Sequence, residues 1–118
     1  MTMRDYPHLP VLSMPQCLAA FNVAGIPVIK LHKVIGVSRM TVYKWRTQGT
    51  TPYPHVLQSV STLAYKCLRA VKAGLLPLPA NASVDAIQQV LSDADERMEL
   101  LDNLKAEDLL AVLPAQNN

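Results

Sequence analysis

Long uninterrupted apolar runs are missing from this sequence of 118 residues. No stretch approaches the roughly 18 to 20 consecutive apolar residues that a membrane-spanning helix requires. The N-terminus also lacks the basic and then apolar order of a secretion signal. We therefore expect a soluble, cytoplasmic protein that does not bind a membrane.

Cysteine is scarce. Cys17 and Cys67 are the only two cysteines, and neither has a second cysteine or a histidine at the spacing of metal ligands. This pattern argues against a zinc site, and we expect neither a metal ion nor a cofactor. Two reduced cysteines in the core are the main expectation, with a disulfide between them as the alternative.

Aromatic residues make up only 5% of the chain, whereas 50% of the residues are hydrophobic. Leu, Val and Ala therefore supply most of the apolar volume, which favours helices packed on helices. The length suits one domain, or one small domain with an appendage. The expected fold class is all-α.

Acidic residues are absent between Asp5 and Asp85. Residues 1–80 hold nine Lys or Arg against one acid, a net charge of +8, whereas residues 81–118 hold two against eight, a net charge of −6. A basic front half suits a polyanion such as nucleic acid, and an acidic rear half does not. The two halves are therefore expected to have different roles.

Cap and turn residues divide the front half into short helices. Ser13 and Gln16 form a capping-box pattern, which predicts a helix over about 14–23. A second helix is expected over 27–35 and a third over about 39–47, each followed by a glycine.

Apolar residues at spacings of three and four predict a longer amphipathic helix from Pro54 to about residue 72. Its basic side is expected to stay solvated. Residues 74–83 contain a glycine and two prolines, so a linker is expected there. The residues expected on the solvated side of the helix are Gln58, Ser59, Thr62, Lys66, Arg69 and Lys72.

The rear half has a heptad-like apolar stripe over residues 84–101. Two alternatives are open for the stripe: packing on the same subunit, or association with a second subunit. A last helix is expected over about 104–113. We therefore predict a domain over 13–73 and a helical oligomerisation segment over 84–113.

The stretch "VIKLHKVIGVSRMTVYKWRTQG", residues 28–49, has the spacing of two helices joined by a tight turn. Gly36 supplies the permissive backbone at the turn. This is the layout of a helix-turn-helix unit. The residues expected to pack inward are Leu31 and Ile35 from the first helix, Val37 from the turn, and Val42 and Trp45 from the second helix.

At 100° per residue, the side of the second helix opposite Val42 and Trp45 carries polar, basic and apolar side chains. Arg or Lys can bind guanine O6 and N7 in a DNA major groove, and Met40 or Tyr43 can touch a thymine methyl group. Other residues around the unit can hold phosphates. The expected base contacts are Ser38, Arg39, Met40, Tyr43 and Lys44, and the expected backbone contacts are Lys30, Lys33, Arg46, Thr47, Gln48, Thr50, Thr51 and Tyr53.

This stretch resembles the helix-turn-helix of phage-type repressors, the Cro and CI kind, and of related small bacterial regulators. The resemblance implies a Cro-like domain of four or five helices, with residues 39–47 as the recognition helix. His32 stands where such motifs commonly have a small residue, and we expect it to be a core or interface histidine. The resemblance covers residues 14 to about 73 and rests on Leu31, Ile35, Gly36, Val37, Ser38, Val42 and Trp45, with Gly49 and Pro52 following the tryptophan.

The expected function is that of a transcriptional repressor that binds double-stranded DNA. A homodimer through 84–113 on an inverted repeat is expected, because one recognition helix contacts only a few base pairs. A small-terminase-like DNA-packaging oligomer and an antitoxin-like protein-interaction module are the alternatives. We expect no enzyme and no small-molecule ligand, because no catalytic set of residues and no phosphate-binding glycine loop is present.

Overall fold

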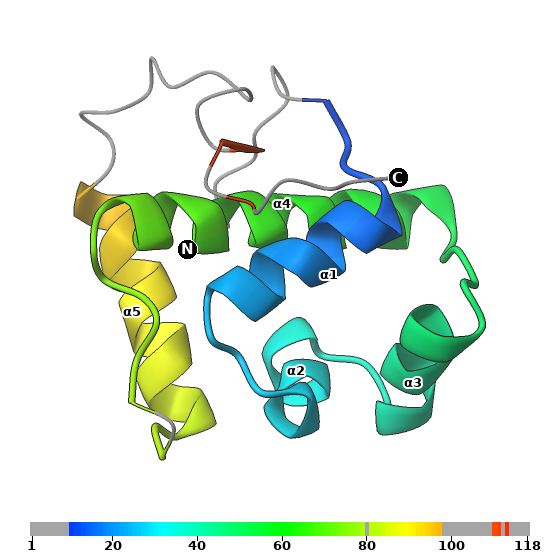
Figure 1. The fold of residues 1–118 in the computed structure, drawn as a ribbon, viewed down its shortest axis with the longest axis horizontal. Coiled ribbons are helices and arrows are strands. Elements are labelled where there is room, and N and C mark those ends of the chain that lie inside the picture. Colours follow the sequence, from blue (N-terminus) through cyan, green and yellow to red (C-terminus); the bar gives the residue numbers. More distant parts are fainter. Residues whose placement is uncertain (1–9, 80, 98–109, 112, 114–118) are drawn as a thin grey trace.

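The regular secondary structure in the described part of the chain is all α-helix (Figure 1). The computed structural model describes residues 10–79, 81–97, 110, 111 and 113. The all-α prediction is confirmed for these residues, whereas most of the helix expected over about 104–113 lies outside them. No helix in the described ranges has the length and hydropathy needed to cross a lipid bilayer. The helices are α1 (Met14–Val23), α2 (Val28–Ile35), α3 (Arg39–Thr47), α4 (Pro54–Lys72) and α5 (Val84–Arg97).

Local caps explain where the first helices begin and end. At the start of α1, the Gln16 backbone N–H donates to the Ser13 side chain, and the Gln16 side chain accepts from the Ser13 N–H. This reciprocal pairing satisfies two donors that a helix N-terminus leaves free. Gly36 ends α2 in the left-handed conformation, with φ of 90°. The predicted bounds of these helices therefore agree with the structure to within one residue.

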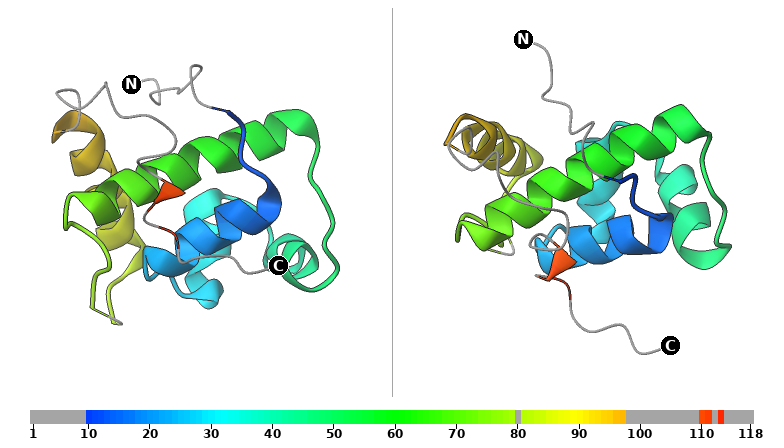
Figure 2. Two further views of the ribbon diagram at one scale, coloured as in Figure 1. Left: turned by 45° about the horizontal axis from the view of Figure 1, so that its top comes forward. Right: turned by 90° about the horizontal axis from the view of Figure 1, so that it is seen from above.

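α4 is the longest helix, and the others are arranged around it (Figures 1 and 2). α1 packs along α4, α5 packs against the C-terminal end of α4, and α2 lies between α5 and α3. Phe21, Tyr65 and Leu68 are completely buried where these helices meet. Burying a side chain such as Phe or Leu stabilises the fold by about 1.5 to 3 kcal/mol.

The expectation that α4 keeps a solvated basic side is wrong for its middle. Lys66 is only 7% exposed and Arg69 only 4%, although Lys72 at the end of the helix is exposed. The chain before α1 lies along this part of α4, because the Leu12 N–H donates to Ser61 Oγ (2.9 Å) and Tyr65 OH donates to the Pro10 carbonyl (2.6 Å). The middle of this central helix is covered on more than one side, which hydrophobic periodicity does not predict. Among the expected solvated residues, Thr62, Lys66 and Arg69 are buried, whereas Gln58, Ser59 and Lys72 are exposed.

The first part of the segment expected as a linker, residues 74–79, packs on the helical core, and the expectation is wrong in this respect. Leu76 is buried, and Leu75 and Leu78 pack against the core from partly exposed positions. Leu110 and Leu113 also pack against it. The glycine and prolines do break the helix, as predicted, but the broken segment is held against the domain.

α5 belongs to the same hydrophobic core as α1 to α4. Ile87 and Leu91 are buried in that core, and α5 packs against both α2 and α4. For these two residues of the heptad-like stripe, packing on the same subunit is the arrangement found. Met98 and Leu101, two later residues of the stripe, lie outside the described residues.

Cys17 and Cys67 are free thiols in the core, as expected. Burial raises the pKa of each thiol to about 12, because the interior disfavours the charged thiolate. No group of three or more His, Cys, Asp or Glu side chains in the described ranges is placed to hold a metal ion.

Candidate nucleic-acid interface

A three-residue turn joins α2 to α3. The N–H groups of Gly36 and Val37 both donate to the His32 carbonyl, at 2.8 and 3.0 Å. Ser38 then caps α3, with its Oγ accepting from the Thr41 N–H at 3.1 Å. The last turn of α2 and the first turn of α3 are therefore both closed by hydrogen bonds.

The interior of the α2–α3 unit (residues 28–47) contains apolar side chains from both helices. Val42 and Trp45 are 2% and 5% exposed, and Leu31 is equally well buried. Ile35 and Val37 are partly buried against the same core. The structure thus places the expected inward residues against the core and Gly36 at the turn, so that Trp45 holds one side of α3 against the domain.

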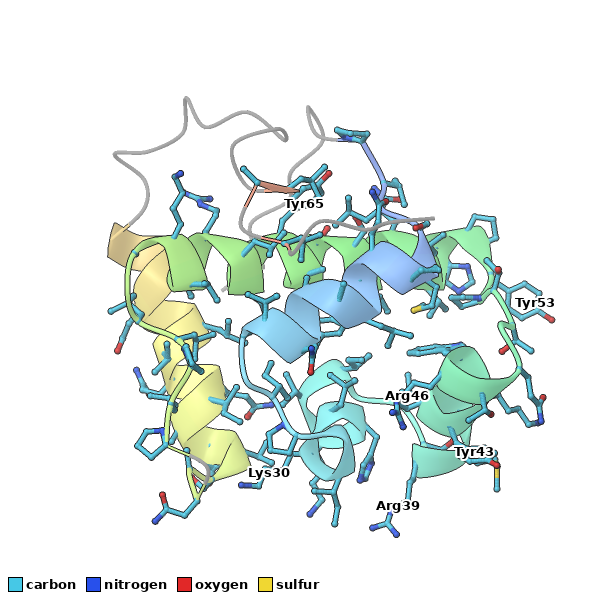
Figure 3. All side chains as sticks on the ribbon, viewed as in Figure 1. Lys30, Arg39, Tyr43, Arg46, Tyr53 and Tyr65 are labelled. Atoms are coloured by element: carbon cyan, nitrogen blue, oxygen red, sulfur yellow. The ribbon has the colours of Figure 1, made fainter. Side chains whose placement is uncertain are left out.

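The opposite side of α3 is exposed. Met40 is 60% exposed and Tyr43 is 52% exposed, and Arg39 and Lys44 also lie on the surface. In Figure 3 the Arg39 and Tyr43 side chains point away from the body of the protein. We call this surface the outward face of α3, and it consists of Arg39, Met40, Tyr43, Lys44 and Thr47.

Most of the expected backbone contacts are exposed near the outward face. Thr47 Oγ1 donates to the Tyr43 carbonyl (2.8 Å), so this hydroxyl also closes the last turn of α3. Tyr53 is 78% exposed, and its ring stacks on His55 with centroids 6.2 Å apart and an interplanar angle of 6°. Sequence analysis gave His55 no role, and its spacing of two residues from Tyr53 across Pro54 is the only signal for the pair. The expected backbone contacts that are exposed are Lys33, Arg46, Thr47, Gln48, Thr50, Thr51 and Tyr53.

Lys30 differs from the other expected backbone contacts. It is partly buried, and its ammonium donates to the Ala82 carbonyl in the segment before α5. In Figure 3 it lies on the α5 side of α2, whereas Arg39 lies on α3. The structure therefore does not bring Lys30 together with the outward face of α3.

His32 lies in α2 and is partly buried. Its Nε2 atom is buried and has no hydrogen-bond partner among the described residues. A position partly inside the domain agrees with the expected core or interface histidine, and a ligand or a pH switch remains the alternative.

The helices α2 and α3 themselves carry cations without acids. Lys33, Arg39, Lys44 and Arg46 are all exposed, and no Asp or Glu occurs between residues 6 and 84. Their charge is therefore not offset by any acid on α1 to α4. Uncompensated cations around one protruding helix produce a positive potential that attracts a polyanion.

The geometry of α3 is compatible with a DNA major groove. A helix with its side chains is about 10 to 12 Å across, and the groove is about 12 Å wide.

No family model, no curated protein and no solved structure matches this chain. A functional interpretation of the α2–α3 unit therefore depends on its own residues.

Proposed function

We propose that this protein is a sequence-specific double-stranded DNA-binding transcriptional repressor, resembling the phage-type helix-turn-helix regulators, and that α3 is its recognition helix. One observation carries the proposal. Val42 and Trp45 hold one side of α3 in the core, while Arg39, Met40, Tyr43 and Lys44 are exposed on the other sides. A helix held in this way can enter a groove without first unfolding from its own domain.

The chemistry of the exposed residues divides into two roles. Arg39 and Lys44 have the donors that bind guanine O6 and N7. Lys33 on α2 and Arg46 on α3 are exposed and supply charge for phosphates, which sets the position of the protein on the duplex. The lack of acids on α1 to α4 supports an anionic partner for all four residues.

A homodimer on an inverted repeat completes the proposal. One helix contacts only a few base pairs, and two-fold dimers place their recognition helices about 34 Å apart on DNA. Ile87 and Leu91 are buried in the core of the same chain, so association within 84–113 requires other residues of that segment.

A footprint on genomic or selected DNA tests the proposed function. We expect protection of a short inverted repeat, with affinity that falls steeply as salt rises. The double variant Arg39→Ala, Lys44→Ala is expected to lower affinity by about 30-fold or more, because each good base contact contributes about 1 to 3 kcal/mol. Lys72→Ala is the matched control, since Lys72 is an exposed cation at the far end of α4.

Three outcomes would contradict the proposal. Binding along DNA without sequence preference would contradict the proposal of a sequence-specific repressor. A ring of eight or more subunits in solution would favour a DNA-packaging oligomer. If the double variant kept every activity, the face would not be a DNA-binding surface, and a protein-interaction module would be favoured.

A further inference from the structure

The central line of the outward face of α3 carries Met40 and Thr47 and no charged side chain. At 100° per residue, Met40 lies almost opposite the side buried by Val42 and Trp45. Tyr43 and Lys44 lie on either side of this central line, and Arg39 lies at the edge. Met40 therefore occupies a position that would lie deepest in a groove, with Tyr43 on one side of it and Lys44 on the other.

Exposed large apolar side chains in this position suit a ligand with an apolar group. Met40 and Tyr43 are among the few large hydrophobic residues that the described part of the chain leaves exposed. They are also surrounded by cations with no acid on α1 to α4, which favours an anionic partner over a second protein surface of the usual apolar kind. The partner must therefore combine negative charge with an apolar group that a helix can reach.

Thymine in duplex DNA meets both requirements. Its C5-methyl group is the one apolar group that an ordinary base pair presents in the major groove. The flexible thioether of methionine adapts to small apolar groups, and a tyrosine ring offers a rigid apolar surface. Guanine edges beside the thymine would suit Arg39 and Lys44.

We infer that α3 selects its DNA half-site by thymine methyl groups that Met40 and Tyr43 contact, with Arg39 and Lys44 binding bases on either side. This inference rests on the proposed function and adds the chemical group that is recognised. Deoxyuridine has the same hydrogen-bonding edges as thymine and lacks only the methyl group. A preference for thymine over deoxyuridine would therefore come from the methyl group and not from hydrogen bonds.

Replacing thymine by deoxyuridine in the bound DNA tests the inference directly. After selection from a random pool, each thymine of the protected site is replaced in turn and the affinity is measured. We expect at least one replacement per half-site to lower affinity about fourfold, the factor for losing burial of one methyl-sized group. Deoxyuridine placed only outside the protected site is the control and is expected to have no effect.

Variants of the same two residues show which side chain meets the methyl group. Met40→Ala keeps a good helix former at an exposed position, so α3 is expected to fold normally. In this variant, or in Tyr43→Ala, the fourfold effect of deoxyuridine should shrink towards one, because the partner of the methyl group is gone. Tyr43→Phe keeps the ring and should keep the effect.

Each contrary outcome overturns a defined part of the argument. A selected site that lacks thymine, or one in which every deoxyuridine replacement leaves affinity unchanged, overturns the inference and leaves the proposed function intact. If no sequence is selected, both fail. If Met40→Ala changes the solution mass and leaves DNA affinity unchanged, the apolar pair belongs to a protein interface and the inference is wrong.

Discussion

Trp45 and Met40 are five residues apart on one helix and have opposite surroundings. Trp45 is in the core, whereas Met40 is on the surface. Removing a buried Trp typically costs about 3 to 5 kcal/mol of stability, and changing an exposed side chain costs little. Substitutions on the two sides of α3 therefore separate effects on folding from effects on binding.

Gly25 is the glycine whose replacement should destabilise the fold most. Gly25 and Gly49 both have positive φ, 72° and 65°, which costs a non-glycine residue about 1 to 2 kcal/mol. A Cβ at residue 25 would also collide with Pro77 Cβ, whereas nothing lies within 4 Å of a Cβ at residue 49. Overpacking of this kind adds about 1 to 3 kcal/mol.

We therefore expect Gly25→Ala to lower the free energy of unfolding more than Gly49→Ala does. Urea denaturation of the two variants and the wild type measures the difference. Equal losses would mean that the segment around Pro77 moves freely away from Gly25.

The two buried thiols make the stability of the protein sensitive to alkaline pH. Their pKa in the folded chain is raised to about 12, against 9.0 for an exposed thiol. Below pH 9 both states carry neutral thiols and stability is unaffected. As pH rises from 9 towards 12 only the unfolded thiols ionise, so each thiol lowers the free energy of unfolding by up to about 1.4 kcal/mol per pH unit.

Urea titrations between pH 9 and 12 measure how the free energy of unfolding changes with pH. The double variant Cys17→Ala, Cys67→Ala is the control, and it should lose the part of this pH dependence that the thiols cause. Alkylation at pH 8 gives a second measurement. Iodoacetamide should modify the native protein far more slowly than the urea-unfolded chain, because both thiols are protonated and covered. Similar rates in the two states would contradict the prediction.

Capping and turn residues predicted where the helices begin and end, but they did not predict which parts of the chain pack over each helix. The cap at Ser13 and the left-handed Gly36 are properties of a few neighbouring residues, so the sequence predicts them directly. On α4, the contacts of Ser61 with Leu12 and of Tyr65 with Pro10 join residues about 50 positions apart in the chain. Helical periodicity shows which residues share a side of α4, but it cannot show that a second side is covered.

In the candidate interface, too, local sequence predicted some features and missed the contacts between distant residues. The inward and outward sides of α3 follow from its periodicity, and the structure has them as expected. The contact between Lys30 and Ala82 links positions 52 residues apart, which no local pattern indicates. The wrongly expected linker at residues 74–83 has the same origin, because glycine and proline predict a break in a helix and not where the broken chain packs.

Lys30 is expected to hold the segment before α5 against α2 rather than to bind a phosphate. Lys30→Met keeps most of the side-chain length and removes the donor to the Ala82 carbonyl. We expect a loss of about 1 to 3 kcal/mol in the free energy of unfolding, since hydrogen bonds from charged groups contribute about this much. The salt dependence of DNA binding should not change.

Lys33→Met is the matched control, because Lys33 is exposed on the same helix. It should leave stability unchanged and reduce the slope of log affinity against log salt by about 0.9, the value for one lost phosphate contact. If Lys30→Met gave the smaller slope and unchanged stability, Lys30 would be a backbone contact after all.

The described residues share one hydrophobic core, although the charge reverses near residue 80. α5 packs against α2 and α4, and Ile87 and Leu91 lie in the same cluster as Phe21 and Trp45. Small domains that share one core usually unfold in a single cooperative step. The acidic rear half therefore contributes to the stability of the basic front half, even though its charge suits a different partner.

This cooperation can be measured at a distance from the substitution. Ile87→Ala should cost about 2 to 5 kcal/mol, because it leaves a cavity between α5 and its neighbours. The single tryptophan lies in α3, at the opposite end of the molecule from α5 (Figure 1). Its fluorescence should report an earlier urea midpoint in Ile87→Ala, matching the midpoint from circular dichroism, whereas the exposed control Gln88→Ala should leave the midpoint unchanged. If Trp45 kept its wild-type midpoint while the helical signal was lost earlier, α5 would unfold independently, and residues 13–73 would form a domain of their own.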